Sequence, residues 1–349
     1  VPQLEQTATP TDARHFLLVG SDSRDGLDDR DLPLGTFGGQ RADTMIYVAI
    51  SEDRESVSLV SLPRDLLVMD GDRQAKLTDT FAGGPDHLVG VIGDNFGLPV
   101  NHYAQISLGG FLDVVDTLGG VTMDIPYALN DPKSGAAFEP GVQHLTPEQA
   151  LAYVRSREHR LGDIARIDRQ QRFIKAVLNE LLETNVFTDP RTLFQLVEDV
   201  ASNVTTDEQL GVSQMRSVAD EMRQVIRDGI PMASVPAYPR RINGFDYMIR
   251  YGPGADAMFE ALRTGQPLPD PGTSEQRSET RVALYSGGRQ QAGEIVAYTL
   301  QWAWFDARPV GIGTESMDAG DTTVVYSLPG EEERAGWVAA VLGADVKPL

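Results

Sequence analysis

Short apolar runs alternate with helical patterns along the first half of the chain. The runs at residues 14–22, 43–51, 56–65, 102–107 and 121–126 are rich in β-branched and aromatic residues and end at turn-forming residues. Between them, residues 84–97 and 108–120 carry apolar side chains at helical spacing and stop at glycine. This alternation predicts the α/β class, with a mixed central sheet covered by helices on both faces in a three-layer α/β/α sandwich.

Three further helices are expected from the middle of the chain, at residues 146–157, 164–186 and 217–226. The first has a clear start, because Thr146 is a good N-cap and Pro147 suits the first helical position. Arg155 and Arg157 are two residues apart and cannot share one face of a helix. We therefore expect this helix to end near them.

The last third of the chain predicts a second, smaller domain. Residues 264–280 are rich in Pro, Gly and Ser without an apolar period, which is typical of a linker. Residues 281–349 follow the order β-α-β-β-α-β, the split βαβ layout of a small α+β domain. We divide the chain into a polar tether (1–13), a large domain (14–263), a linker (264–280) and a C-terminal domain (281–349).

Composition narrows the possible functions. The chain has 349 residues with 51 acidic and 30 basic side chains, a net charge of −21, which argues against a nucleic-acid partner. It has no cysteine, so disulfides and thiolate sites are excluded. No apolar run reaches the length of a membrane span. Because the sequence starts at Val1, we expect that an N-terminal signal or anchor was removed.

One stretch has the opposite charge. Residues 155–175 hold six arginines and Lys175 against three acids, a net charge of +4. Asp163, Arg166 and Gln170 share one polar face if the segment is helical. Arginines beside a helix N-terminus favour a phosphate-type anion. A solvated helix face with salt bridges explains the same charges equally well.

Acids and arginines also stand next to several predicted strands. Arg64 follows one strand behind a proline, Asp22 follows another, and Arg41 and Asp43 precede a third. Ligands tend to bind at such sheet ends. Asp22 and Asp43 have the chemistry to hold Mg²⁺, which takes one or two carboxylates together with phosphate oxygens. Each residue alone is also a common turn or cap residue.

Taken together, these motifs resemble the LytR–CpsA–Psr family. The resemblance rests on "LLVGSDSR", "RADTMIYVAI", "VSLPRDL", "KLTDTF", "NHYAQISLGGFLDVVDTLGGVTMDIP" and "LTPEQALAYVRSRE" with "GDIARIDRQQRF", and covers about residues 14–262. Residues 281–349 resemble the small C-terminal domain of actinobacterial members. The resemblance implies a membrane-anchored, extracytoplasmic enzyme. It would move a glycopolymer from a polyprenyl (pyro)phosphate carrier to peptidoglycan, at a muramic acid hydroxyl, or to a glycosylated surface protein.

The family motifs assign roles to individual residues. The implied catalytic residues are Asp43, Arg64, Arg155, Arg157, Asp163 and Arg166. The implied pyrophosphate-binding residues are Arg41, Arg64, Lys76, Arg155, Arg157, Arg166 and Gln170. Asp22 and Asp43 would hold Mg²⁺, with Mn²⁺ as a substitute. The general base stays open, because Asp163 either accepts the proton or only orients Arg166.

Other readings compete with this one. Water in place of the acceptor would make the protein a polyprenyl pyrophosphate hydrolase, and an arginine cluster without chemistry would make it a glycan-binding or regulatory envelope protein. Residues 247–262 imitate a dinucleotide-binding strand, glycine turn and helix. The Pro-rich segment that follows stands where the next strand and acid of such a site belong. The histidines show no metal-ligand spacing.

Overall fold

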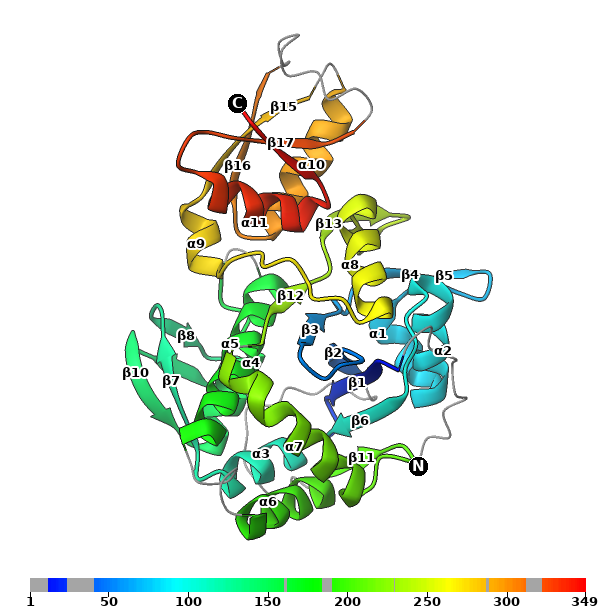
Figure 1. The fold of residues 1–349 in the computed structure, drawn as a ribbon, viewed down its shortest axis with the longest axis vertical. Coiled ribbons are helices and arrows are strands. Elements are labelled where there is room, and N and C mark those ends of the chain that lie inside the picture. Colours follow the sequence, from blue (N-terminus) through cyan, green and yellow to red (C-terminus); the bar gives the residue numbers. More distant parts are fainter. Residues whose placement is uncertain are drawn as a thin grey trace.

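The computed structural model describes residues 12–23, 41–159, 162–183, 190–228, 230–286, 289–311 and 322–349. Most of the predicted tether lies outside these residues. A six-stranded sheet with the order β11-β6-β1-β2-β3-β12 forms the centre of the large domain (Figure 1). Its strands are β1 (Arg14–Ser21), β2 (Ala42–Ile50), β3 (Val57–Ser61), β6 (His102–Ile106), β11 (Val204–Thr206) and β12 (Met232–Ser234).

The central sheet is mixed, as predicted. β1, β2 and β3 pair in antiparallel fashion, whereas β6 runs parallel to β1 and β12 runs parallel to β3. Alternate residues of each strand point to opposite faces. Met45 and Tyr47 join one buried cluster, and Ile46 and Val48 join another.

Helices pack on both faces. The cluster around Met45 includes side chains of α2 (Pro85–Phe96) and α8 (Gly252–Thr264). The cluster around Ile46 is closed by α5 (Asp163–Glu183) and α7 (Val212–Asp228). The short elements β4 (Leu67–Asp70), β5 (Arg73–Lys76), α1 (Leu77–Thr80) and the 3₁₀ turn η1 (Phe81–Gly83) follow β3.

A second group of elements lies beside the main sheet. It contains α3 (Leu108–Thr117), α4 (Pro147–Arg155) and the paired strands β7 (Val121–Ile125) with β10 (Gly141–Leu145) and β8 (Leu129–Asp131) with β9 (Ala136–Phe138). The hydrophobic pattern did not predict β8, β9 or β10. It also did not predict α6 (Pro190–Asn203), β11, β12 or the hairpin of β13 (Ala237–Ile242) and β14 (Phe245–Arg250).

The C-terminal domain has the predicted element order but a different strand pairing. Its elements are β15 (Arg281–Tyr285), α10 (Gln290–Trp302), β16 (Asp306–Gly311), β17 (Val324–Ser327), α11 (Glu332–Leu342) and β18 (Asp345–Pro348). β15 bonds directly to β16, and β17 to β18, both parallel. The βαβ units are therefore not split. Sequence patterns give the order of strands but not their neighbours.

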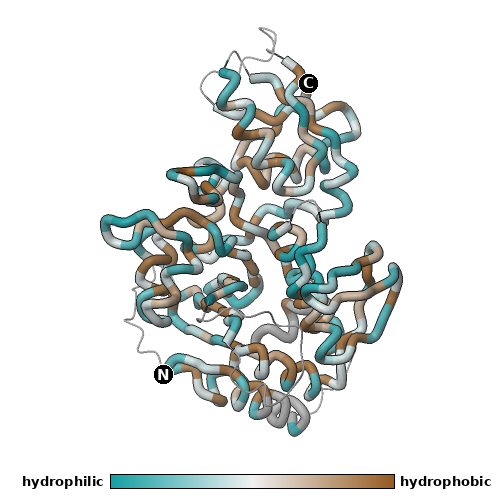
Figure 2. Tube along the Cα trace, turned by 180° about the vertical axis from the view of Figure 1, so that it is seen from behind, coloured by the Kyte–Doolittle hydropathy of each residue, from teal (hydrophilic) through white to brown (hydrophobic). Residues whose placement is uncertain are grey.

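The predicted linker contains the short helix α9 (Ser274–Glu279). Thr273 caps this helix through a reciprocal hydrogen-bond pair with Gln276. In the described part of the chain, no helix has the length and hydrophobicity needed to cross a membrane. Figure 2 accordingly shows hydrophobic and hydrophilic positions interleaved along the elements.

Candidate active site

The first strands bring their end residues together at one edge of the sheet. Asp43 and Thr44 lie at the start of β2, and Arg64 lies in the turn after β3. The backbone N–H of Asp22 donates to the carbonyl of Arg41 (3.0 Å), and the N–H of Arg41 donates to Oδ1 of Asp22 (2.6 Å). These bonds hold Asp22, Arg41 and Asp43 at neighbouring strand ends.

Arg64 is the centre of an ion-pair cluster. Its Nη1 lies 2.6 Å from Oδ1 of Asp43, and its Nε lies 3.2 Å from Oδ2 of Asp163. Asp65 is farther away, with its Oδ2 at 3.7 Å from the same Nε. Burial alone would lower the pKa of Arg64, but Asp163 and Asp43 outweigh it and raise the pKa.

Asp163, the first residue of α5, contacts three arginines. Its Oδ1 lies 3.3 Å from Nε of Arg157 and 3.6 Å from Nη1 of Arg166, and Oδ2 meets Arg64. Burial would raise the pKa of Asp163, but Arg166, Arg64 and Arg157 together lower it. The carboxylate is ionised and orients the guanidinium groups around it.

Arg166 is the most buried of these arginines, with 5% of its side chain exposed. Its Nε has no hydrogen-bond acceptor among the described residues. Burial lowers its pKa to about 10, and the nearby positive charges of Arg157 and Arg64 act in the same direction. A buried guanidinium that is only partly compensated is poised to bind an added anion.

The junction of α4 and α5 presents Arg155 and Arg157. Thr146 caps α4 in a reciprocal pair with Gln149, and the helix ends at Arg155, as the spacing predicted. The carboxylate of Asp131 accepts hydrogen bonds from the Ser156 hydroxyl (2.9 Å) and the Arg157 N–H (3.1 Å). This buried acid fixes the turn that aims both arginines.

A cavity of about 1160 Å³ opens at this cluster and continues between the sheet and the helices; we call it the first cavity. Phe16, Leu18 and Ile46 line it from the sheet. Further apolar side chains come from α3, α5, α6 and α7, among them Phe111, Phe173, Leu178, Val197 and Met215.

The mouth of the first cavity is basic. Among the described residues that line the cavity, six are positive and three negative, a net charge of +3: Arg41, Arg64, Lys133, Arg155, Arg157 and Arg166, against Asp22, Asp43 and Asp131. Sequence reasoning missed Lys133, because one exposed lysine in a turn carries no pattern.

The structure brings most of the predicted site residues to this cavity. Gln170 lines it and donates to the Thr44 hydroxyl at 2.8 Å. Lys76 lies behind the cluster instead, with its Nζ 2.9 Å from Oδ1 of Asp65. Arg169 is turned away toward Tyr127, Arg172 pairs with Asp168, and residue 160 lies outside the described residues.

Asp22 and Asp43 both line the first cavity. Within the described ranges, no group of three or more His, Asp or Glu side chains is arranged as a metal site. Two carboxylates beside a basic pocket still have the chemistry to hold Mg²⁺, which takes few protein ligands and completes its shell with water and the oxygens of an anionic ligand.

The glycine-rich start of α8 has a packing role. A Cβ on Gly254 would overlap the carbonyl oxygen of Val341 in α11. The glycine therefore allows the C-terminal domain to pack closely on α8. This contact accounts for the glycine in the motif that imitates a dinucleotide site.

The fold and this site define a class: an α/β protein with an arginine cluster at a largely apolar cavity. The family model for LytR_cpsA_psr matches residues 2–264. The chain belongs to the LytR_cpsA_psr family.

Two relatives come from Corynebacterium glutamicum. The chain is 33% identical to "Probable cell wall biosynthesis protein LcpB" over 72% of this chain and 62% of the relative. It is 28% identical to "Cell wall biosynthesis protein LcpA" over 88% of this chain and 65% of the relative. The chain thus spans just under two thirds of each relative's length. Teichoic acid transferase TagU of Bacillus subtilis is 33% identical over 52% of this chain and 59% of the relative.

Solved structures share the fold. A LytR-Csp2A-Psr enzyme from Actinomyces oris superposes with a TM-score of 0.61 at 25% identity, covering 73% of this chain and 92% of that one. TagV of B. subtilis gives 0.60 at 21% identity, covering 73% and 98%. These matches confirm the mixed α/β architecture of the large domain.

Proposed function

We propose that this protein is a phosphotransferase that moves a glycopolymer from a polyprenyl pyrophosphate carrier to a cell-wall acceptor. The observation that carries the proposal is the first cavity, whose lining combines a net charge of +3 with many apolar side chains. Such a cavity suits an amphiphile with an anionic head and a hydrocarbon tail. The printed name of TagU, a polyisoprenyl-teichoic acid–peptidoglycan teichoic acid transferase, supports the same substrate class.

The two ends of the donor would be bound by different forces. Each buried CH₂ of the prenyl chain contributes about 0.8 kcal/mol, so partial burial gives tight binding. Each charge-assisted hydrogen bond from an arginine to a phosphate oxygen contributes roughly 1.5–3 kcal/mol. Arg64, Arg155, Arg157 and Arg166 line the first cavity and would bind the pyrophosphate there.

Transfer asks the protein mainly for positioning and charge stabilisation. The same four arginines would stabilise the phosphoryl oxygens as the bond to the carrier breaks. Asp43 and Asp22 would hold Mg²⁺, which supplies further neutralisation of phosphate charge when bound. Asp163 would orient the arginines and accept the proton of the acceptor hydroxyl. The acceptor would be a peptidoglycan muramic acid hydroxyl or a surface protein. The enzyme would be anchored to the membrane and act on its outer side.

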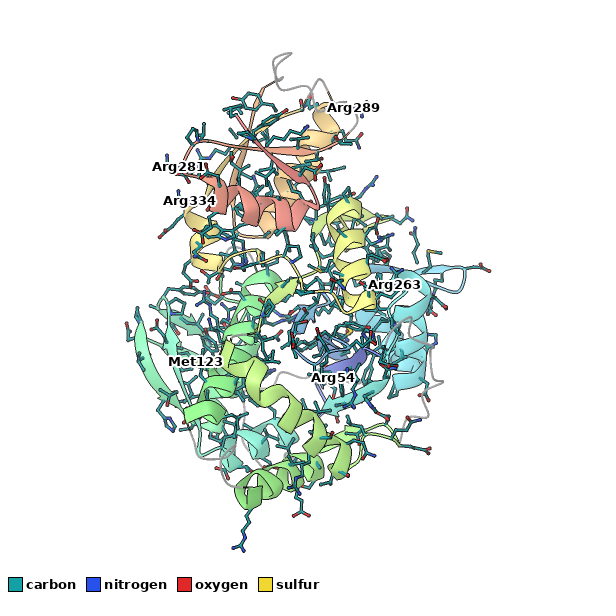
Figure 3. The ribbon with its side chains drawn as sticks, in the orientation of Figure 1. Arg54, Met123, Arg263, Arg281, Arg289 and Arg334 are labelled. Atoms are coloured by element: carbon teal, nitrogen blue, oxygen red, sulfur yellow. The ribbon has the colours of Figure 1, made fainter. Side chains whose placement is uncertain are left out.

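The test measures phosphate release from a polyprenyl pyrophosphate with and without Mg²⁺. Arg155→Ala removes one guanidinium from the cavity mouth and should slow release roughly 30- to 100-fold, which corresponds to about 2–3 kcal/mol. Arg334→Ala is the matched control. Arg334 is exposed on α11 of the C-terminal domain (Figure 3), is paired with Glu331 and lines neither cavity.

Release that needs Mg²⁺ and falls only in Arg155→Ala supports the proposed site. Release that persists when a saccharide acceptor is present, with no transfer to it, would identify a hydrolase. Lipid binding without any turnover would identify a binding protein. Failure of the wild type to bind the lipid would refute the proposal.

A further inference from the structure

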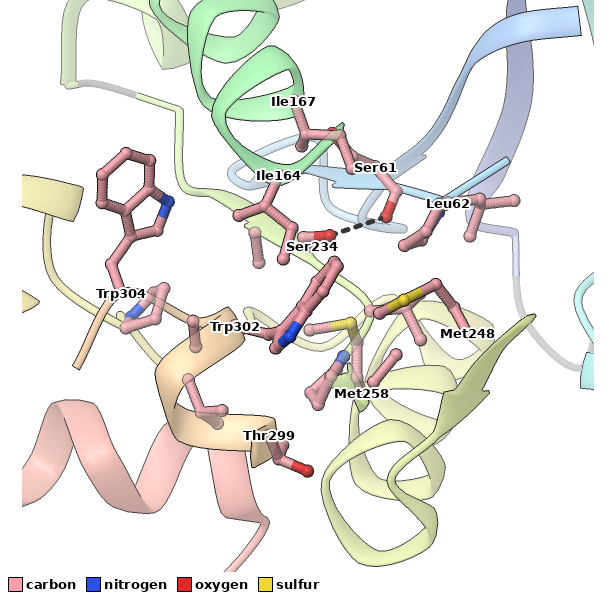
Figure 4. Close-up of a pocket in the computed structure, with 18 of the residues that line it drawn as sticks. Ser61, Leu62, Ile164, Ile167, Ser234, Met248, Met258, Thr299, Trp302 and Trp304 are labelled. Carbon is pink, nitrogen blue, oxygen red and sulfur yellow. Dashed lines mark hydrogen bonds between the residues drawn. The ribbon is translucent and has the colours of Figure 1, made fainter. Parts of the chain in front are cut away.

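A second cavity of about 800 Å³ lies between the large and C-terminal domains. Figure 4 shows Trp302 of α10 reaching toward Met248 and Met258 of the large domain. Ile164 and Ile167 of α5 line another side. Both domains therefore form the walls of this second cavity.

The two cavities meet at the ion-pair cluster. Their shared lining residues are Asp43, Thr44, Arg64, Arg166 and Gln170. Elsewhere they take opposite faces of the sheet, since Ile46 lines the first cavity and its neighbour Met45 lines the second. A phosphate held by Arg64 and Arg166 is thus open to both cavities.

Phosphoryl transfer places the attacking and leaving oxygens roughly in line across the phosphorus. If the carrier lipid occupies the first cavity, the leaving polyprenyl phosphate departs on that side. The attacking hydroxyl must then arrive from the second cavity. We propose that the second cavity binds the acceptor, an uncharged saccharide segment, and that the C-terminal domain forms half of this acceptor site. This inference rests on the proposed function.

Charge separates the occupants of the two cavities. Among the described residues that line the second cavity, six are aspartates and three are arginines, a net charge of −3, whereas the first cavity has +3. The aspartates are Asp43, Asp65, Asp163, Asp168, Asp246 and Asp345. A negative lining disfavours an anionic glycopolymer and tolerates a neutral saccharide.

The other side chains suit a sugar. The indole of Trp302 offers a flat apolar surface for the C–H face of a pyranose ring. Ser61, Ser234 and Thr299 line the same cavity. The hydroxyls of Ser234 and Thr299 donate to the carbonyls of Ser61 and Ile295, so their oxygens are left to accept hydrogen bonds from sugar hydroxyls. A few polar groups within an apolar cavity fix the orientation of a ligand.

Trp304 connects the second cavity to the arginines. It lines the cavity and stacks on His159 with ring centroids 5.1 Å apart. His159 lies in the segment between Arg157 and Asp163. Trp304 also has φ 75°, a conformation that bulky residues rarely adopt and that surrounding contacts must hold. An occupant that touches Trp304 is therefore linked through His159 to the segment that joins Arg157 to Asp163.

The chemical step balances with residues already placed. The acceptor oxygen forms a bond to the phosphorus that bears the glycan, and the bond from that phosphorus to the polyprenyl phosphate oxygen breaks. The carrier leaves with the electron pair. Asp163, which lines the second cavity and not the first, receives the hydroxyl proton.

The test is a substitution in α11 that fills part of the second cavity. Gly336 of α11 lines the cavity, and a Cβ there meets nothing within 4 Å, so Gly336→Phe places a ring inside without a backbone clash. Gly90→Phe is the matched control, because Gly90 is also helical with open space around its Cβ but lines neither cavity.

Binding of a soluble N-acetylglucosamine tetrasaccharide is followed by tryptophan fluorescence of the full chain. We expect saturable binding in the wild type and in Gly90→Phe, and at least tenfold weaker binding in Gly336→Phe. A second assay uses polyprenyl-pyrophosphate-linked N-acetylglucosamine as donor. It measures the ratio of transfer to hydrolysis, which should fall in Gly336→Phe only.

Failure of the acceptor-site proposal can be distinguished from failure of the proposed function. No saccharide binding by the wild type, or equal binding and equal ratios in both variants, would overturn the acceptor site while leaving the proposed function intact. Saccharide binding that Gly336→Phe abolishes, without turnover of any lipid donor, would support the second cavity as a saccharide site and count against the proposed transferase.

Discussion

Replacing Arg166 with methionine should stabilise the ligand-free protein while weakening anion binding. Arg166 has 5% of its side chain exposed and an unpaired Nε among the described residues. Removing it leaves no stranded carboxylate, because Asp163 keeps Arg64 and Arg157 as partners. Methionine has a similar reach and no charge to desolvate.

The magnitude follows from the pKa of Arg166, which burial lowers to about 10. At 1.36 kcal/mol per pKa unit, this shift makes the charged form cost about 3 kcal/mol at neutral pH. The cost is fully present at neutral pH and falls only as pH rises above about 10. Allowing for lost packing, we expect a net gain of about 1–2 kcal/mol, or roughly 2–6 °C in Tm.

Arg169 provides the control, because it is similarly buried on the same helix and its Nε also lacks an acceptor among the described residues, but both of its Nη groups donate to neutral oxygens. Its Nη1 donates to the Tyr127 hydroxyl (3.1 Å) and its Nη2 to the Ser156 carbonyl (2.5 Å). Arg169→Met should therefore destabilise the protein by about 2–4 kcal/mol.

Denaturant unfolding with and without pyrophosphate measures both quantities. Pyrophosphate should raise the stability of the wild type and raise that of Arg166→Met by much less. If Arg166→Met unfolds more easily than the wild type, the buried guanidinium is already compensated, and the argument for a poised anion site fails.

Three further predictions concern packing, capping and pH. Gly254→Ala should separate the C-terminal domain from α8, because the new Cβ overlaps the Val341 carbonyl; limited proteolysis within residues 264–280 should accelerate, and unchanged cleavage would contradict this. Thr146→Ala should cost about 1 kcal/mol of unfolding free energy through the lost cap of α4, with Thr146→Ser nearly neutral. Burial lowers the pKa of His15 to about 4, so the unfolded chain takes up its proton first and stability falls as pH drops from 6.5 to 4, by up to about 3 kcal/mol. His15→Phe should flatten that part of the stability profile; a profile that keeps its slope would count against the assignment.

Local rules were enough to predict the parts of the fold that local interactions determine. Thr146 and Pro147 predicted the start of α4, and the two-residue spacing of Arg155 and Arg157 predicted its end. The strands around Asp43 and Arg64 were predicted from β-branched runs bounded by turn residues. The strand-end motifs then indicated that these residues meet, because ends of neighbouring strands lie at one edge of a sheet.

Features that depend on nonlocal packing could not be predicted. The pairing of β15 with β16 is set by which strands become neighbours. Lys76 belongs to a family motif, but its Nζ contacts Asp65 and does not line the first cavity. The direction in which a side chain extends depends on the packing around it, which the motif does not encode. The second cavity has no sequence signal at all, since its walls come from residues as far apart as Met45 and Val341.

Under the proposed function, the charges around Asp163 determine the order in which the two cavities are used. With no donor bound, three arginines hold the pKa of Asp163 below its usual range, which makes its carboxylate a weak base. A bound pyrophosphate would neutralise part of that positive charge and so raise the basicity of Asp163. The acid that faces the second cavity would then accept a proton only after the donor has filled the first. This order protects an acceptor hydroxyl from activation when there is nothing to transfer.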